Sequence, residues 1–150
     1  MKISVDQISI RIQNNAFDPE AEQRQLRTGW RDMGALVAFV GLMRDFHDGE
    51  IIEKMYLEHY PGMTEQSLQR LATDAWAQWP LHTIRIVHRV GLLQPQEPIV
   101  LVAVGSRHRR EAFAACMYLI DKLKEQVPLW KKQQTAQSSH WVSPAAGYGG

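Results

Sequence analysis

The sequence predicts an α+β fold in which antiparallel strand pairs pack against helices. Alternating or continuous apolar runs predict strands at about 8–12, 34–41, 51–59, 84–90 and 99–104. Short connections join the second strand to the third and the fourth to the fifth, and strands joined in this way favour antiparallel pairing. Helical patterns stand between and after these pairs, so the order differs from the strict strand–helix alternation of a doubly wound sheet.

The first predicted helix begins at a strong start signal. Asp18-Pro19-Glu20 combines a capping residue, a proline at the first helical position and an acid in the first turn. The helix is expected to run to about Thr28. The apolar run 34–41 is long enough for a buried strand. Residues 45–49 have the composition of a turn, so 51–59 is expected to be the returning strand.

Two longer helices are predicted from apolar residues that recur at helical spacing. Pro61-Gly62 ends the preceding strand and begins one helix, which Pro80 ends. The other is expected from about Arg107 to Gln126, before Pro128. The residues expected on the buried faces are Leu68, Leu71, Ala72, Ala75, Trp76 and Trp79 in the first helix, and Phe113, Cys116, Met117, Ile120 and Leu123 in the second.

The chain length limits the domain organisation. With 150 residues the chain has the size of one domain, and we expect residues 1–142 to form it. Residues 91–98 are expected to form a loop, and the polar segment between Trp130 and Trp141 has no clear periodicity. Residues 143–150, with the sequence Ser-Pro-Ala-Ala-Gly-Tyr-Gly-Gly, are expected to be a flexible C-terminal tail.

Charge and cysteine content argue against several classes of protein. Lys and Arg number 17 against 16 Asp and Glu, and the net charge of +1 provides no overall attraction for nucleic acid. No apolar run approaches the roughly 18 residues of a membrane-spanning helix, and residues 1–13 lack the pattern of a signal peptide. Cys116 is the one cysteine, so no internal disulfide forms, and no cysteine pair or histidine spacing suits a metal. We therefore expect a cytoplasmic protein without a bound metal.

The most informative local feature is the basic segment Gly105-Ser-Arg-His-Arg-Arg110 at the predicted start of the last helix. Its serine is a suitable helix cap, and the four basic residues that follow would occupy the first turn. The amino end of a helix already carries partial positive charge, so cations there are unfavourable unless an anion binds. Two interpretations stay open from this feature alone, a phosphate site and a solvated basic turn.

Three further basic residues stand at the ends of predicted elements. Lys124 lies in the last helical turn, Lys131 follows seven residues later, and Arg44 directly follows a predicted strand. Each has an ordinary structural explanation, because lysines complement helix ends and arginines extend from sheet edges. However, residues 126–150 contain no Asp or Glu, so the lysines lack acidic neighbours in the sequence. The residues alone thus indicate an α+β domain whose basic groups are available to bind a small anion.

Several longer motifs resemble those of the large, catalytic subunit of molybdopterin synthase. The most specific is Leu57-Glu-His-Tyr-Pro-Gly-Met-Thr-Glu65, which is similar to a strand-to-helix signature of that family. The resemblance covers roughly residues 34–142, in the family's order and near its spacing. It extends through Gly41-Leu-Met-Arg44, Trp79-Pro80, Val87-His-Arg-Val-Gly91, Ser106-Arg-His-Arg109, Leu123-Lys124 and Pro128-Leu-Trp-Lys-Lys132.

The resemblance implies a fold of the α/β-hammerhead type, a reaction and a set of partners. The subunit would form a homodimer, and a small ubiquitin-like sulfur carrier would dock at each end to give a heterotetramer. The carrier's C-terminal Gly-Gly thiocarboxylate would enter the active site. The enzyme would be a sulfurtransferase that delivers two sulfurs to cyclic pyranopterin monophosphate (precursor Z), forming the dithiolene of molybdopterin in molybdenum cofactor biosynthesis. This subunit would need no metal and no nucleotide cofactor.

The resemblance also assigns roles to individual residues. Lys124 matches the family's essential catalytic lysine, beside the carrier's tail. Leu42 stands where some members have a lysine, so its contact would use the main chain, and residues 142–146 lack an arginine that some members have after the tryptophan matching Trp141. The implied substrate contacts are Leu42, Met43, Arg44, His108, Arg109, Lys124, Lys131, Lys132 and Gln133.

Two other classes of function are alternatives. One is a non-catalytic carrier-binding or regulatory module of the same fold. The other is a binder of single-stranded nucleic acid that uses Trp130 and Trp141. The net charge of +1 argues against the nucleic-acid binder. The non-catalytic module is disfavoured by the presence of the basic residues Arg44, His108, Arg109, Lys124 and Lys131.

Overall fold

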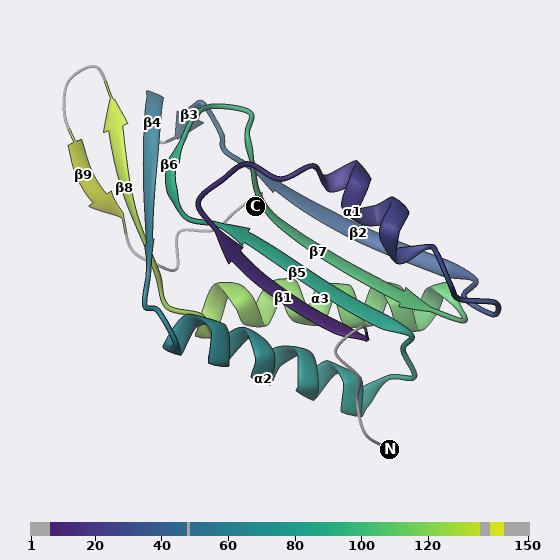
Figure 1. Cartoon of the computed structure of the whole chain (residues 1–150). Coiled ribbons are helices and arrows are strands. Elements are labelled where there is room, and N and C mark those ends of the chain that lie inside the picture. The colour runs from purple at the N-terminus through teal and green to yellow at the C-terminus, as the bar shows by residue number, and fades with distance from the viewer. Residues whose placement is uncertain (1–6, 48, 136–138, 143–150) are drawn as a thin grey trace.

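The computed structural model describes residues 7–47, 49–135 and 139–142, which form three helices and nine strands (Figure 1). The mixture of antiparallel strand pairs and packed helices confirms the α+β class. The predicted tail, residues 143–150, lies outside the described residues. In chain order the elements are β1 (Ile8–Gln13), α1 (Pro19–Leu26), β2 (Ala35–Leu42), β3 (Phe46–His47), β4 (Glu50–His59), α2 (Met63–Gln78), β5 (Thr83–Arg89), β6 (Gly91–Leu93), β7 (Pro98–Ser106), α3 (Arg109–Gln126), β8 (Leu129–Thr135) and β9 (Ser139–Val142).

The first sheet has the strand order β1-β5-β7-β2. The predicted antiparallel pairing of β5 with β7 is confirmed, while β1 lies parallel to β5. The predicted pairing of β2 with β4 is wrong, because the register of β2 breaks between Gly41 and Leu42 and the chain then crosses to the second sheet. β2 pairs with β7 instead and forms the edge of the first sheet. With a neighbour on one side only, residues 35–40 of this strand are half-buried rather than buried as predicted.

The main core lies between this sheet and the helices α2 and α3, which form the lower layer in Figure 1. The buried face of α2 includes Leu68, Leu71, Ala72 and Ala75, as predicted, whereas the predicted Trp76 and Trp79 are half-buried and Trp79 follows the helix end. On α3 the buried residues are Ala112, Ala115, Cys116, Leu119 and Leu123. The prediction for α3 is partly wrong, since Phe113 and Met117 are 62% and 60% exposed. They lie one position round the helix from the alanine and cysteine positions that face the sheet.

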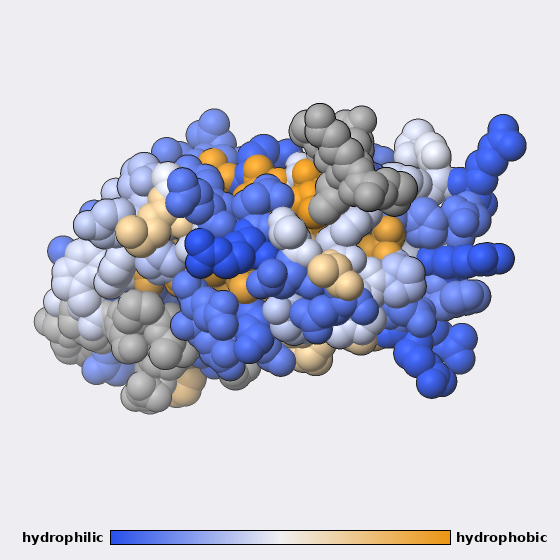
Figure 2. Space-filling model, turned by 90° about the horizontal axis from the view of Figure 1, so that it is seen from below, coloured by the Kyte–Doolittle hydropathy of each residue, from blue (hydrophilic) through white to orange (hydrophobic). Residues whose placement is uncertain are grey.

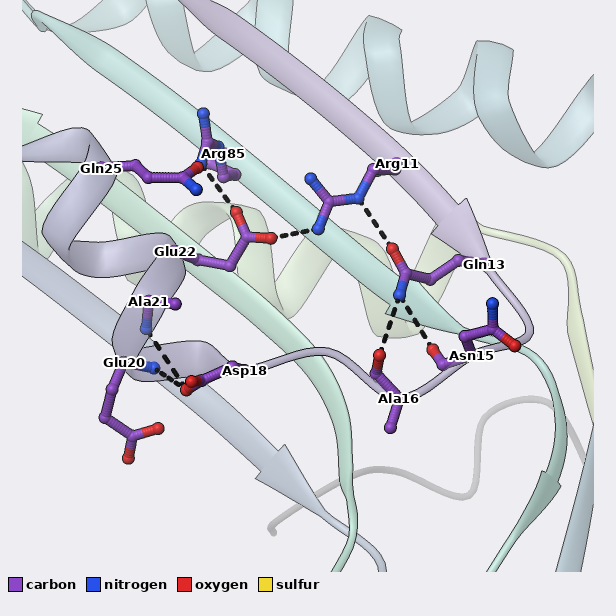
Figure 3. A network of polar contacts seen from close by, with 10 residues as sticks. All are labelled: Arg11, Gln13, Asn15, Ala16, Asp18, Glu20, Ala21, Glu22, Gln25 and Arg85. Carbon is purple, nitrogen blue, oxygen red and sulfur yellow. Dashed lines mark hydrogen bonds and ion pairs between the residues drawn. The ribbon is translucent and has the colours of Figure 1, made fainter.

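The helix α1 covers the opposite face of the first sheet and is attached to it by a polar network (Figure 3). Asp18 caps the helix as predicted, and its carboxylate accepts hydrogen bonds from the N–H groups of residues 20 and 21. Glu22 is buried, and its carboxylate accepts a hydrogen bond from Arg85 at 2.7 Å and pairs with Arg11. One carboxylate therefore joins α1 to both β1 and β5.

The second sheet has the order β3-β4-β8-β9, and β6 pairs with β4 on the edge opposite β8, further along the edge that β3 also uses. It stands at the end of the molecule where α2 begins and α3 ends (Figure 1). Four of its strands were not predicted: β3 lies in the expected turn 45–49, β6 lies in the expected loop 91–98, and β8 and β9 lie in the segment without periodicity. β8 was not predicted because it lacks an alternation of apolar and polar residues. Its buried positions after Leu129 are the polar residues Lys131, Gln133 and Thr135.

The surface of the helical layer is mainly hydrophilic (Figure 2). Apolar areas on this face are small and are separated by polar side chains, and long hydrophilic side chains project from the end where α3 begins. Among the helices that the structure describes, none has the length and apolar character needed to cross a membrane.

Candidate functional site

Lys124 and Lys131 flank the short turn that joins α3 to β8. The helix ends at Gln126, and the next residue has an extended backbone with φ −96° and ψ 123°. Pro128 follows, and a proline both prevents helix continuation and favours an extended conformation at the preceding residue. Leu129 then enters β8 opposite His59 of β4. This turn directs the chain back to the junction of the two sheets, where the two lysines interact electrostatically.

Lys131 is a buried cation with like charges nearby. It lies on the inner face of β8 and is 7% exposed. Burial is the main cause that lowers the pKa of Lys131 from 10.5 to about 8, and the positive charges of Arg44 and Lys124 lower it further. Around mildly alkaline pH this side chain is present in both protonation states. It is therefore suited both to bind an anion and to exchange a proton.

The predicted contacts 131–133 do not share one side of the second sheet, because successive strand residues face opposite sides. Lys131 and Gln133 are buried on the inner face. Lys132 is exposed on the outer face, with its Nζ 5.8 Å from the centre of the Trp141 ring. Tyr56 and Leu92 line a cavity of about 370 Å³ with these two residues. The side chain of Lys132 thus points away from Lys131.

The predicted contacts 42–44 lie where β2 ends, and they differ in exposure. Leu42 is 45% exposed, whereas Met43 is buried in the core. The Met43 N–H donates to the carbonyl of Glu97 and its carbonyl accepts from the N–H of Gln96, both at 2.9 Å. These bonds fix the main chain just before Arg44, whose charge acts on Lys131. Arg44 therefore belongs with the two lysines, and Met43 supports its position from the core.

His108 and Arg109 lie at the opposite end of α3 from Lys124. Arg109 is the first helical residue, and His108 occupies the cap position without a capping side-chain hydrogen bond. At 1.5 Å per residue, 15 residues separate Arg109 from Lys124 by about 22 Å along the helix axis. One chain therefore does not bring all the predicted site residues together.

The predicted start of this helix needs a correction. Ser106 is the buried last residue of β7 rather than the helix cap, and its hydroxyl donates to the carbonyl of Pro80 at 3.0 Å. Only two of the four basic residues lie in the first turn, where Glu111 accompanies them. The conflict with the helix dipole is therefore weaker than the sequence suggests. Beside the helix start is a cavity of about 540 Å³, whose lining includes Trp76, Trp79 and His108.

We call Arg44, Lys124 and Lys131 the basic cluster. Three neighbouring cations, one of them buried, favour an anionic ligand and stabilise negative charge that develops on a bound group. Within residues 7–47, 49–135 and 139–142, no group of three or more His, Cys, Asp or Glu side chains is arranged to hold a metal ion. The chemistry that this arrangement supports is anion binding, stabilisation of an oxyanion and proton exchange.

His88 borders the basic cluster from β5 and was not among the predicted site residues. It is fully buried, and its Nδ1 lies 2.7 Å from the carbonyl oxygen of Arg89. Burial lowers the pKa of His88 to about 4, and the charge of Lys131 contributes to this fall. His88 is therefore uncharged at neutral pH. In the sequence it is indistinguishable from an ordinary strand histidine.

Thr64 was also missed, and it holds the turn between the two lysines. It is fully buried in the first turn of α2. Its hydroxyl donates to the carbonyl of Pro128 at 3.1 Å and accepts from the N–H of Tyr60 at 2.9 Å. The available signal was a hydroxyl residue two positions after Gly62, since such residues often bind main-chain groups at helix starts.

The cysteine is part of the core, as predicted from its place in the helix. Cys116 is 3% exposed, and its Sγ lies 3.6 Å from the carbonyl oxygen of Val102. Burial raises the pKa of its thiol to about 11. The nucleophilic thiolate is therefore rare at neutral pH.

Comparison with known proteins gives a consistent result. The family model described as MoaE protein matches residues 12–126. A molybdopterin synthase catalytic subunit of Pseudomonas aeruginosa is 48% identical over 135 residues, which are 90% of each chain. The solved molybdopterin biosynthesis MoaE protein of Burkholderia ambifaria is 44% identical, with a TM-score of 0.81 over 93% of this chain and 92% of that one.

A more distant solved structure has the same fold. It is a complex of subunits 1 and 2 of the molybdopterin-converting factor from Helicobacter pylori, in which the matched chain is 17% identical. Its TM-score is 0.75, and the match covers 92% of both chains. The family model spans most of the chain, and the relatives are matched over nearly their whole length. The chain therefore belongs to the MoaE family of molybdopterin synthase catalytic subunits.

Proposed function

We propose that this chain transfers sulfur from a thiocarboxylated carrier protein to cyclic pyranopterin monophosphate. The carrier is a small ubiquitin-like protein whose C-terminal Gly-Gly carries the sulfur, and two transfers form the dithiolene of molybdopterin. The observation that carries this proposal is the basic cluster at the turn between α3 and β8, in a chain of this family. Both reactants are anions, one a cyclic phosphate and the other a thiocarboxylate, so three cations suit them.

Lys124 is the proposed catalytic residue, beside the carrier's tail. In each transfer the thiocarboxylate sulfur forms a bond to a substrate carbon while a carbon–oxygen bond at that carbon breaks, and the oxygen leaves with the phosphate or as water. Water then cleaves the bond between sulfur and the carrier's acyl group, so the sulfur stays on the substrate and the carrier leaves as a carboxylate. Negative charge develops on the acyl oxygen during this step, and a nearby ammonium group stabilises it. Lys131, with its pKa lowered to about 8, is the proposed proton-transfer group. Arg44 and Gln133 would hold the substrate beside it.

His108 and Arg109 are the proposed phosphate ligands, and their distance from Lys124 supports a homodimer. The separation of about 22 Å along α3 exceeds the reach of one small substrate. A two-fold contact that sets the start of one α3 beside the end of the other would produce two equivalent, complete sites. The exposed Phe113 and Met117 provide apolar surface on α3 for such a contact.

The carrier would bind at each end of this dimer and give a heterotetramer. The curated relatives are named as catalytic subunits, which supports a second, separate subunit. The solved H. pylori complex of two converting-factor subunits gives further support. The single buried thiol suits the reducing cytoplasm, where we place the reaction.

The test is conversion in vitro with the purified chain, thiocarboxylated carrier and precursor Z, with molybdopterin measured by mass spectrometry. We expect product from the wild type and none from Lys124→Ala, while the dimer and carrier binding persist. Lys122→Ala is the matched control, because Lys122 lies on the same helix and contacts Glu125 at 3.7 Å. Binding of an active carrier without product from the wild type would overturn the proposal and favour a non-catalytic carrier-binding module.

A further inference from the structure

Thr64 connects the adjoining ends of β4 and α2 to a turn that is distant in the sequence. Its N–H donates to the carbonyl of Tyr60 at the end of β4, and its hydroxyl accepts from the N–H of the same residue, both at 2.9 Å. The hydroxyl also donates to the carbonyl of Pro128, 64 residues further along the chain. One fully buried hydroxyl thus ties the end of β4 and the start of α2 to the turn that separates Lys124 from Lys131.

The hydrogen bond to Pro128 controls where β8 begins. Val127 is the last residue tied to α3, through its N–H to the carbonyl of Leu123 at 3.2 Å, and Leu129 is the first residue paired with β4. Pro128 lies between these two anchors and has no N–H to donate. Its carbonyl is therefore the one main-chain hydrogen-bonding group of this residue, and Thr64 satisfies it.

The position of β8 in turn decides the environment of Lys131. Two residues after Leu129, the Lys131 side chain enters the junction of the sheets, where it is 7% exposed. A shift or opening at the start of β8 would admit water to this ammonium group and change its distance from Lys124. Displacements of about 1 Å at such positions are known to lower rates by up to about a hundredfold.

We propose that Thr64 is a positioning residue for sulfur transfer, whose hydroxyl fixes the turn at Pro128 and so keeps Lys131 buried beside Lys124. The inference rests on the proposed function for its effect on rate, but not for its effect on Lys131. Loss of the hydroxyl would lower kcat and raise the pKa of Lys131 from about 8 toward its ordinary 10.5, because burial is the main cause of the lowered value. KM would change little, since Thr64 does not touch the substrate.

The experiment compares Thr64→Val, Thr64→Ser and Thr73→Val. Valine keeps the shape of threonine without the hydroxyl, and serine keeps the hydroxyl. Thr73 is the matched control, since it lies on the same helix and its hydroxyl donates to a main-chain carbonyl, that of Gln69, at 2.9 Å, but on the exposed surface. For each variant we would measure kcat and KM of the complex with carrier, and titrate the Lys131 Nζ by NMR, with Lys131→Arg to assign its signal.

The expected result is a fall in kcat of about tenfold or more in Thr64→Val, with Thr64→Ser and Thr73→Val within about twofold of the wild type. The pKa of Lys131 would rise in Thr64→Val alone. An unchanged pKa and kcat in folded Thr64→Val would overturn the inference, as would a Thr64→Ser variant as defective as Thr64→Val. Should Thr64→Val not fold, Thr64→Cys, with its weaker donor and acceptor, would replace it with the same expected direction.

The titration separates this inference from the proposed function. A wild type that makes no molybdopterin, together with a raised Lys131 pKa in Thr64→Val, would reject the proposed function and support the positioning of Lys131 by Thr64. An active wild type with an unchanged Lys131 pKa and kcat in Thr64→Val would support the proposed function and reject the positioning of Lys131 by Thr64.

Discussion

Replacement of Lys131 by methionine should stabilise the fold while it removes activity. Methionine has a similar length but no charge, so the variant does not bury an ammonium group. A fall of the pKa from 10.5 to about 8 corresponds, at about 1.4 kcal/mol for each tenfold change in protonation, to on the order of 3 kcal/mol. This is the cost of keeping Lys131 protonated in the folded protein below pH 8. We expect Lys131→Met to raise the free energy of unfolding at pH 7 by much of this amount.

The sign of the pH dependence provides a second check. Between pH 8 and 10.5 the unfolded chain binds a proton at Lys131 more strongly than the folded chain, so this group makes stability rise with pH across that window. Urea denaturation from pH 7 to 10.5 should therefore show a difference between Lys131→Met and the wild type that shrinks as pH rises. Lys132→Met, at the exposed neighbouring position, should change stability by less than about 1 kcal/mol at every pH. A less stable Lys131→Met, or a difference independent of pH, would refute this reasoning.

Three other substitutions test separate parts of the structure. Cys116→Ala should retain sulfur transfer, because the thiol is buried and protonated, and should lower the free energy of unfolding by about 1–2 kcal/mol in urea denaturation; a folded but inactive variant would contradict this. Glu22→Gln should cost roughly 2–3 kcal/mol, because it leaves Arg85 without its buried carboxylate partner, and unchanged stability would contradict the network in Figure 3. Arg109→Ala should weaken substrate binding by about 1.5–3 kcal/mol in a binding assay and lose the rise in melting temperature that sulfate gives the wild type; equal stabilisation of both proteins by sulfate would show that the anion binds elsewhere.

The elements that the sequence predicted well are those whose signals are local. Asp18-Pro19-Glu20 specified the start of α1 by capping chemistry, and Pro61-Gly62 marked the end of β4 and the start of α2, where Gly62 has a positive φ of 87°. The apolar patterns predicted the strands β5 and β7, and the short connection between them predicted their antiparallel pairing. These patterns act within a few residues, so they do not depend on contacts with distant segments of the chain.

The second sheet was largely missed because the inward positions of β8 carry polar residues rather than apolar ones. Lys131 and Gln133 occupy inward positions of β8 that a typical strand would fill with apolar residues. The pairing of β2 with β7 rather than with β4 likewise depends on a long-range competition that local patterns do not contain.

The candidate site was predicted in composition but not in arrangement. The sequence singled out Lys124, Arg44 and Lys131, the resemblance assigned their roles, and these three do lie together. It did not indicate that strand alternation turns Lys132 to the outer face, or that the length of α3 separates Arg109 from Lys124. Thr64 was missed because its role depends on a contact with Pro128, 64 residues away.

Complementation between two inactive variants tests the central claim, that each sulfur-transfer site combines Lys124 of one copy with Arg109 of another. Lys124→Ala and Arg109→Ala chains would be mixed after unfolding and refolding, then assayed with carrier at a substrate concentration where neither variant alone gives appreciable product. If the sites are shared, each mixed dimer contains one intact site, and random pairing should restore about a quarter of wild-type activity. If both residues served the same site from one chain, every site in the mixture would carry a substitution. Activity no greater than that of the separate variants, with mixed dimers verified by mass spectrometry, would contradict the account.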